Sequence, residues 1–149
     1  LAETAVNSGS FDFGIMYRIG IRDLKLGMTI QNLGGQFTFD ERESSLPVIF
    51  KVGVSFYAWK NEKQSVSLAA EFQHPSDNLE RANVGLEYYL NRMFFVRTGY
   101  HINYDTDGMA FGFGASVPTG ETTRIQADYS GVDMGPLGFL NRISLGVTF

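Results

Sequence analysis

Alternation of apolar and polar residues runs through almost the whole chain and constrains its fold more than any other feature. Successive side chains of a β-strand point to opposite faces, so a period of two predicts strands with one apolar face each. No long window favours the i, i+3, i+4, i+7 spacing of an amphipathic helix. The alternation predicts nine strands, over residues 10–19, 23–32, 47–58, 64–74, 81–90, 93–102, 108–117, 122–131 and 141–149.

The length of these strands suits a membrane. Most run about ten residues, near the roughly 9–11 that a tilted strand needs to cross a bilayer, whereas strands of soluble proteins average about 5–6. No window reaches the roughly 18 consecutive apolar residues of a transmembrane helix. The sequence therefore predicts an all-β protein, either an antiparallel up-and-down barrel in a membrane or a soluble lipocalin-like binding barrel, which would turn its apolar face inward.

Composition narrows the class of protein. The 149 residues suit one domain, 1–149, and a net charge of −4 argues against a nucleic-acid partner. The absence of Cys excludes disulfides and thiolate metal sites. The start, "LAETAVNSGS", has no basic or apolar signal region and no Met, so we expect a processed chain or a fragment.

Charged residues alternate with the apolar ones and are mixed in sign. On a membrane barrel this second face would line the lumen, and many of the seventeen Gly share it. Salt bridges within the lumen and a selectivity-tuning role for the positive excess are both consistent with these charges. The candidate lumen-facing charges are Asp12, Arg18, Lys25, Lys51, Glu71, Glu87, Arg97, Arg124, Asp128 and Arg142.

Aromatic residues and connection lengths both favour the membrane barrel. Aromatics gather near predicted strand ends, where a membrane girdle would place them; they are Tyr17, Phe56, Tyr57, Trp59, Tyr88, Tyr89, Phe94 and Tyr100. Short connections alternate with longer ones, as periplasmic turns alternate with extracellular loops in bacterial outer-membrane barrels. With a periplasmic C-terminus, we expect the loops at 33–46, 75–80, 103–107 and 132–140 outside the cell. A lipocalin would also show a Gly-x-Trp near its start and a late helix, and neither is present.

No motif predicts catalysis, a cofactor or a metal. Asn103-Tyr-Asp105-Thr-Asp107-Gly108 resembles the opening of a calcium loop, but the twelfth position is Gly114 instead of an acid. His74 and His101 lack the spacing of metal ligands, and no Ser is paired with either by a local motif. We therefore expect a protein that is not an enzyme.

Several stretches together resemble the PorV/PorQ family of outer-membrane proteins, which is related to FadL-type transporters. They are "IQNLGGQF", "LPVIFKVGVSF", "LAAEFQHPSDNLERANVGLEYYLNRMFFVRTGY", "GMAFGFGAS" and "IQADYS…RISLGVTF". The resemblance implies a fourteen-stranded barrel in the bacterial outer membrane, of which this chain is the C-terminal part. Nine strands fit such a part, because closed bacterial single-chain barrels have an even number. It also implies that the alternate residues Ile143, Leu145, Val147 and Phe149 form the signal that the barrel-assembly machinery reads.

The resemblance implies a role in type IX protein secretion, by engaging cargo or attaching it to the cell surface. The long loop at 33–46 is the candidate surface for secretion components or cargo, since loops on rigid scaffolds usually carry binding residues. Its candidate contact residues are Phe37, Phe39, Asp40, Glu41, Arg42 and Glu43. The alternative is a FadL-like transporter of hydrophobic molecules across the outer membrane, and the sequence does not separate the two.

Overall fold

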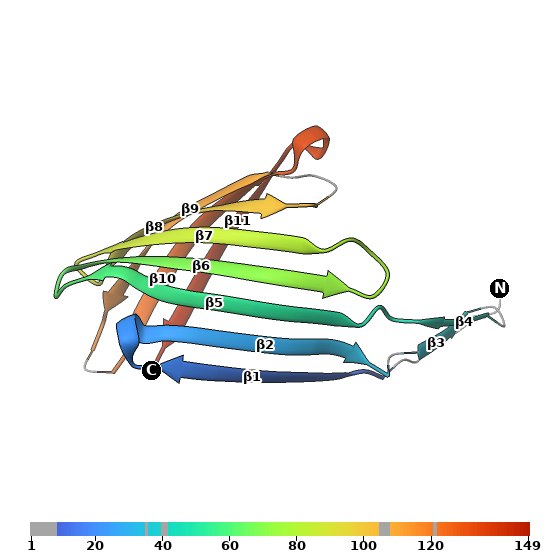
Figure 1. Cartoon of the computed structure of the whole chain (residues 1–149). Helices are drawn as coiled ribbons and strands as arrows, with labels where there is room; N and C mark the ends of the chain where they lie inside the picture. Colours follow the sequence, from blue (N-terminus) through green and yellow to red (C-terminus); the bar gives the residue numbers. More distant parts are fainter. Residues whose placement is uncertain (1–8, 35, 40–41, 105–107, 121) are drawn as a thin grey trace.

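A computed structural model describes residues 9–34, 36–39, 42–104, 108–120 and 122–149. The protein is all-β, with one sheet of nine antiparallel strands (Figure 1). All nine predicted strands are present, within a few residues of their expected ends. They are β1 (Phe11–Ile19), β2 (Leu24–Leu33), β5 (Ile49–Lys60), β6 (Gln64–Pro75), β7 (Arg81–Leu90), β8 (Phe94–Ile102), β9 (Met109–Pro118), β10 (Arg124–Asp133) and β11 (Phe139–Thr148).

The sheet is a meander that does not close. Its spatial order is β1-β2-β5-β6-β7-β8-β9-β10-β11, so each strand of the sheet pairs with its neighbours along the chain. The outer edges of β1 and β11 pair with no other strand of the described chain. Because every neighbouring pair is antiparallel and the strands number nine, β1 and β11 run in the same direction.

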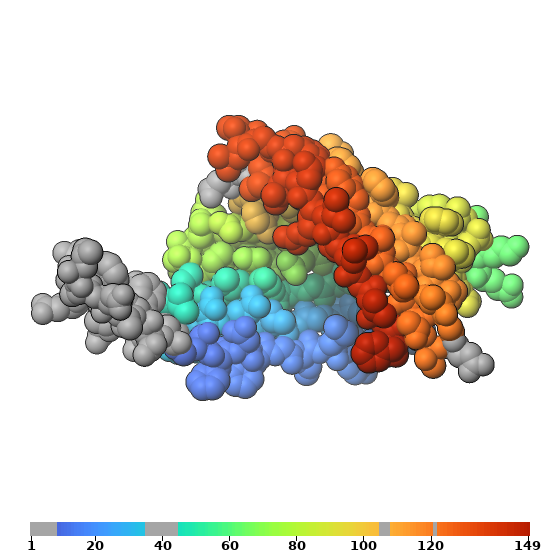
Figure 2. Space-filling view, turned by 180° about the vertical axis from the view of Figure 1, so that it is seen from behind, coloured from blue at the N-terminus to red at the C-terminus, as the bar shows by residue number. Residues whose placement is uncertain are grey.

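The sheet is strongly curved. In Figure 1 the strands β10 and β11 cross behind β5 to β7, and Figure 2 shows a hollow between β11 and the first strands of the sheet. The face that carries the charges lines this hollow and is concave. The alternate, apolar face is convex and covers the outside of the curve.

The apolar side chains do not form a protein core. Phe95, 3% exposed, is the one buried hydrophobic residue among those described. The convex side chains are open to the surroundings: Val96 is 57% exposed and Leu145 81%. Cross-strand hydrogen bonds and contacts between neighbouring strands therefore hold the sheet together.

The connections hold one feature that the sequence pattern did not predict. The segment between β2 and β5 forms a hairpin of two short strands, β3 (Gln36–Phe39) and β4 (Arg42–Ser45), which pair only with each other. The other turns are short and include the 3-10 turns η1 (Ile21–Asp23) and η2 (Gly135–Leu137). The predicted loops at 75–80 and 132–140 are shorter than expected, because β6 and β10 extend into them. The difference in length between predicted loops and predicted turns is therefore smaller than the sequence indicated. Only the connection that carries the hairpin is much longer than the rest.

Candidate functional site: the two faces of the sheet

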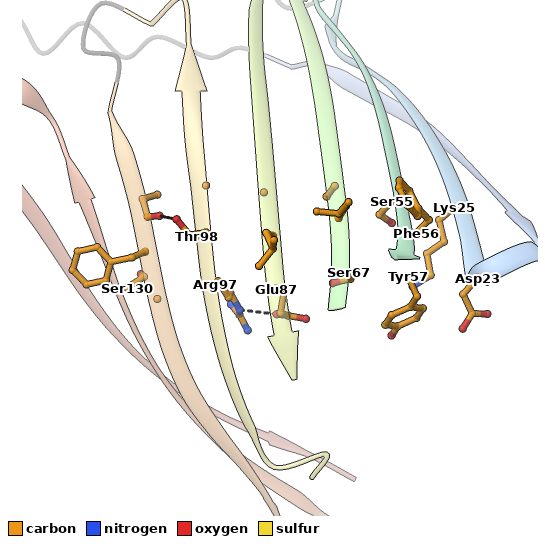
Figure 3. A pocket seen from close by; sticks show the side chains of 18 residues that line it. Asp23, Lys25, Ser55, Phe56, Tyr57, Ser67, Glu87, Arg97, Thr98 and Ser130 are labelled. Atoms are coloured by element: carbon orange, nitrogen blue, oxygen red, sulfur yellow. Dashed lines mark hydrogen bonds and ion pairs between the residues drawn. The ribbon is translucent and has the colours of Figure 1, made fainter. Parts of the chain in front are cut away.

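The concave face brings together charges from strands far apart in the sequence. A hollow of about 490 Å³ is bounded by residues from β2 to β10, with Lys25, Glu87 and Arg97 among them (Figure 3). A second hollow of about 330 Å³ is lined by Lys25, Lys51 and Glu71. Five of the ten candidate lumen-facing charges therefore line these two hollows.

Arg97 is the centre of an ionic network on this face. Its Nε donates to Glu87 Oε2 at 2.8 Å, and its Nη2 lies 3.3 Å from Asp128 Oδ1. Gln126 Nε2 also donates to both oxygens of Asp128, at 3.1 and 2.8 Å. Three candidate charges from β7, β8 and β10 thus form a single cluster that connects four neighbouring strands, β7 to β10.

Glycines on β9 make this network sterically feasible. Gly112 lies opposite Arg97 in the β8–β9 register, and Gly114 lies opposite Asp128 in the β9–β10 register. Without side chains at these two positions, the guanidinium group reaches across β9 to the next strand. A Cβ added to Gly114 would also collide with the ring of Phe95 and the carbonyl oxygen of Ala127. Both glycines are therefore required by close approach over β9.

Two aromatic rings pack beside the ionic network of Arg97 on the concave face. Phe95 stacks on Tyr89 with ring centroids 5.5 Å apart, and the Arg97 guanidinium lies 4.3 Å from the Phe95 centroid. The sequence prediction missed Phe95, because its neighbour Phe94 fits the apolar face and Phe95 therefore alternates into the polar one. Tyr89 belongs to the same inner layer.

Two aromatics predicted for a girdle are thus on the wrong face. Tyr89 lies opposite Ser65, and Tyr57 lies opposite Ser67, so both point to the concave side. Around Ala58 the register of β5 shifts by one residue, which returns Trp59 to the convex face. The alternation could not reveal this shift, since an apolar run is compatible with either phase.

The first strands of the concave face have positive charges without carboxylate partners. Arg18 and Lys25 are directly opposite each other in the β1–β2 register, an unfavourable arrangement for like charges. Lys51 follows on β5, opposite Thr29. Within the described residues, no ion pair reaches Arg18, Lys25 or Lys51. This half of the concave face therefore carries a net positive field.

The remaining candidate charges lie nearer the ends or the edge. Asp12 Oδ1 accepts the backbone N–H of Asn32 at 2.9 Å. Arg124 donates to Ser116 Oγ at 3.2 Å and to the carbonyl oxygen of Arg92 at 2.7 Å. Arg142 is exposed on the edge strand β11, opposite Ser130. These three have structural or solvent contacts and do not line either hollow.

An ion pair joins the η1 turn, between β1 and β2, to the last residue of β5. Lys60 Nζ donates to Asp23 Oδ2 at 2.9 Å, and the ammonium group also lies 4.4 Å from the Tyr57 ring centroid. The hydrogen bond from Lys60 and its positive charge lower the pKa of the exposed Asp23 carboxyl below its usual value. Asp23 thereby fixes the turn at one edge of the larger hollow.

The convex face has the opposite chemistry. In β5, Phe50 and Trp59 bracket Val52 and Val54. In β8, Phe94 and Tyr100 bracket Val96 and Thr98, whereas β9 has Phe111 and Phe113 near its middle. Within the nine-stranded sheet, Asp133 is the one Asp, Glu, Lys or Arg at a convex position, and it is the last residue of β10, opposite Phe139.

Two polar side chains of the convex face have hydrogen-bond partners on a neighbouring strand. Tyr129 donates its hydroxyl to Asn141 Oδ1 at 2.6 Å, and Thr98 donates to the carbonyl oxygen of Ala110 at 3.3 Å. Rings of Phe111 and Phe139 cover Gly131, beside the Tyr129 pair. Such pairing is what an apolar solvent requires, because it offers no hydrogen bond in exchange.

The candidate partner loop is described only in part. The backbone of Phe37, Phe39, Arg42 and Glu43 belongs to the β3–β4 hairpin, whereas Asp40 and Glu41 lie outside the described residues. The candidate assembly signal is on the convex side of the edge strand. Ile143, Leu145, Val147 and Phe149 are all exposed there.

Neither histidine lies in a cluster of metal ligands. His74 Nδ1 is 3.2 Å from Glu80 Oε1, and His101 packs against Tyr104 with ring centroids 5.1 Å apart. Within the described ranges, no three His, Cys, Asp or Glu side chains form a group that could hold a metal. Residues 105–107 of the calcium-like segment fall outside those ranges.

No helix in the described part of the chain is long and apolar enough to span a membrane. Comparison with known proteins found no matching family model, no matching curated protein and no matching solved structure.

Proposed function

We propose that this chain forms part of the wall of a β-barrel in a bacterial outer membrane. One observation carries the proposal: the exposed convex face is apolar, while the concave face holds the charges. Exposed apolar surface on this scale is unfavourable in water, and lipid removes that penalty. A polar interior and an apolar exterior band are the pattern of outer-membrane barrels.

Two further features support a lipid exterior. Aromatic residues lie near both ends of the convex face in β5 and β8, as in the girdles at both membrane interfaces. The polar convex residues Asn141 and Thr98 have hydrogen-bond partners on neighbouring strands. A soluble lipocalin-like barrel has less support, because it would gather its apolar side chains on the concave face.

The open sheet supports a larger barrel. Direct pairing of β1 with β11 would be parallel, since the two strands run in the same direction, unlike every other pair of the sheet. An odd number of additional antiparallel strands would complete the wall without a parallel pair. Adding five to the nine present gives the fourteen that the resemblance to PorV/PorQ proteins implies.

Within the barrel, the β3–β4 hairpin is the proposed contact for secretion components or cargo. It projects from the sheet and pairs with no other strand (Figure 1). The role that follows from the family resemblance is type IX secretion or surface attachment of secreted proteins. The exposed, alternating apolar residues of β11 are the proposed contact for the barrel-assembly machinery.

A FadL-like transporter remains the second candidate, because the larger hollow of about 490 Å³ offers space on the concave face. Replacing Gln36–Ser45 by a flexible Gly/Ser linker separates the two functions. Secretion of cargo should fail while the barrel still inserts, as judged by its gel mobility with and without heating. Loss of uptake of hydrophobic compounds with normal secretion would instead support the transporter.

Topology is tested by single cysteines on the Cys-free background. A membrane-impermeant thiol reagent applied to intact cells should label Ser44→Cys in the hairpin. It should leave Asn61→Cys, in the turn after β5, unlabelled. The reverse pattern would invert the barrel, and labelling of both would contradict a chain that spans the membrane.

A further inference from the structure

The smaller hollow on the concave face has a floor without side chains. Gly27 of β2 and Gly53 of β5 are paired across the strands. A Cβ on Gly27 would have no atom within 4 Å, and one on Gly53 would meet only a carbonyl oxygen at 3.7 Å. Open space of about 330 Å³ therefore lies above these two glycines.

Two lysines lie on either side of this floor, Lys25 opposite Ser55 and Lys51 opposite Thr29. Lys25 and Lys51 flank the glycine pair from β2 and β5 and line the hollow. Both are half-buried, and no carboxylate of the described chain lies within ion-pair distance of either. Two long side chains with free ammonium groups can thus turn toward the same space.

Two further residues that line this hollow, Thr29 and Asn83, have polar atoms without hydrogen-bond partners. Asn83 donates its Nδ2 to Glu71 Oε1 and to the Tyr104 hydroxyl, both at 3.1 Å, which fixes the orientation of the amide. Its Oδ1 atom is buried and accepts no hydrogen bond, and the buried Thr29 hydroxyl also lacks a partner. Buried polar atoms of this kind are usually satisfied by water or by a ligand.

We propose that this hollow binds a small anion, a carboxylate or a phosphate ester, that also carries a hydrogen-bond donor. Lys25 and Lys51 hold the anionic group, while Asn83 Oδ1 and the Glu71 carboxylate accept from a hydroxyl of the ligand. The Thr29 hydroxyl donates to the same anion. The inference rests on the proposed function in one respect, since it takes the concave face as the water-filled interior of the barrel.

The chain offers a direct probe, because it contains only four lysines. Reductive methylation with 13C-formaldehyde gives each lysine its own NMR signal in detergent micelles, and Lys→Arg variants assign the signals. Glycerol 3-phosphate tests a phosphate ester and lactate tests a carboxylate, and each compound also carries a hydroxyl donor. Methyl phosphate and acetate are matched controls that lack the hydroxyl donor.

With glycerol 3-phosphate or lactate, the signals of Lys25 and Lys51 should shift and saturate together, while those of Lys60 and Lys63 stay in place. Lys51→Gln should weaken binding at least tenfold, and Thr29→Val several-fold, whereas Lys63→Gln should have no effect. The donor-free controls should bind more weakly.

Parallel, unsaturable shifts of all four lysines would mean ionic screening only and would overturn the site. Equal effects of Lys51→Gln and Lys63→Gln would overturn it as well. Gel mobility of the same samples, with and without heating, reports the folded barrel independently. A folded barrel without saturable shifts therefore removes the anion site and leaves the proposed function intact.

Discussion

Val96 and Arg97 are neighbours on β8, yet they lie in opposite environments. Val96 points to the convex side and has no charged neighbour directly across the strands, since Tyr88 and Phe113 flank it. Arg97 points to the concave side, where two carboxylates and the Phe95 ring surround its guanidinium. The difference teaches that the ionic network of the sheet lies on its concave side, while the convex side offers only apolar and aromatic contacts around Val96. The proposed lipid exterior is the environment that suits such a side.

The largest expected effect comes from placing a charge on the convex side. Val96→Arg should lower the free energy of unfolding in lipid vesicles by about 2–4 kcal/mol, because arginine at the bilayer midplane is that unfavourable. Ser67→Arg puts the same side chain on the concave side of β6. We expect that control to fold normally in a urea titration followed by Trp59 fluorescence. Equal destabilisation by Val96→Arg and Ser67→Arg would contradict the proposal that only the convex face contacts lipid.

The second largest loss of stability should come from adding a methyl group to a crowded glycine on the concave side. Gly114→Ala should destabilise the sheet by about 1–3 kcal/mol, since the added methyl group overpacks against Phe95 and the Ala127 carbonyl. Gly27→Ala is the matched control, because its Cβ meets nothing within 4 Å. The same urea titration measures both. If the two alanines behave alike, the close packing over β9 is not required.

Removing the charge of Arg97 should have a smaller effect. Arg97→Gln leaves Glu87 and Asp128 without their shared cation, and we expect a loss of about 1 kcal/mol that shrinks at high salt. Arg142→Gln on the edge strand should change the stability by less than about 0.5 kcal/mol. A salt-independent loss would assign the effect of Arg97 to packing on Phe95.

The smallest expected effect concerns the turn ion pair. Lys60 lowers the pKa of Asp23, so the ionised carboxylate favours the folded state. Its contribution is complete above the ordinary value of 3.8 and is lost as the pH falls through the lower folded value. Asp23→Asn should therefore be slightly less stable than the native chain at neutral pH and equal to it in strong acid. A difference that persists in acid would point to another role for Asp23.

The sequence predicted the strands well because their alternation is long and regular. It missed the β3–β4 hairpin, since four-residue strands are too short to show a period. It also assigned Tyr57 and Tyr89 to the wrong face. A bulge at Ala58 shifts the alternation after Tyr57, and Tyr89 follows another aromatic residue, so that the sequence does not show which of the two points outward.

The candidate charges were predictable as residues of one face, but not as a network. Alternation places Glu87, Arg97 and Asp128 on the same side of their strands. Which of them meet depends on register across β9 and on the two glycines there, and neither property is local in sequence. The unpartnered Asn83 Oδ1 depends likewise on the pairing of β6 with β7.

The central claim is that lipid covers the convex face and water the concave one. A cysteine scan of β8 tests it most directly, with a spin label attached to single cysteines from 94 to 102 on the Cys-free chain in lipid vesicles. Collision rates with lipid-soluble oxygen should peak at 94, 96, 98 and 100, and those with a water-soluble nickel complex at 95, 97, 99 and 101. The opposite phase, or no alternation at all, would contradict the account.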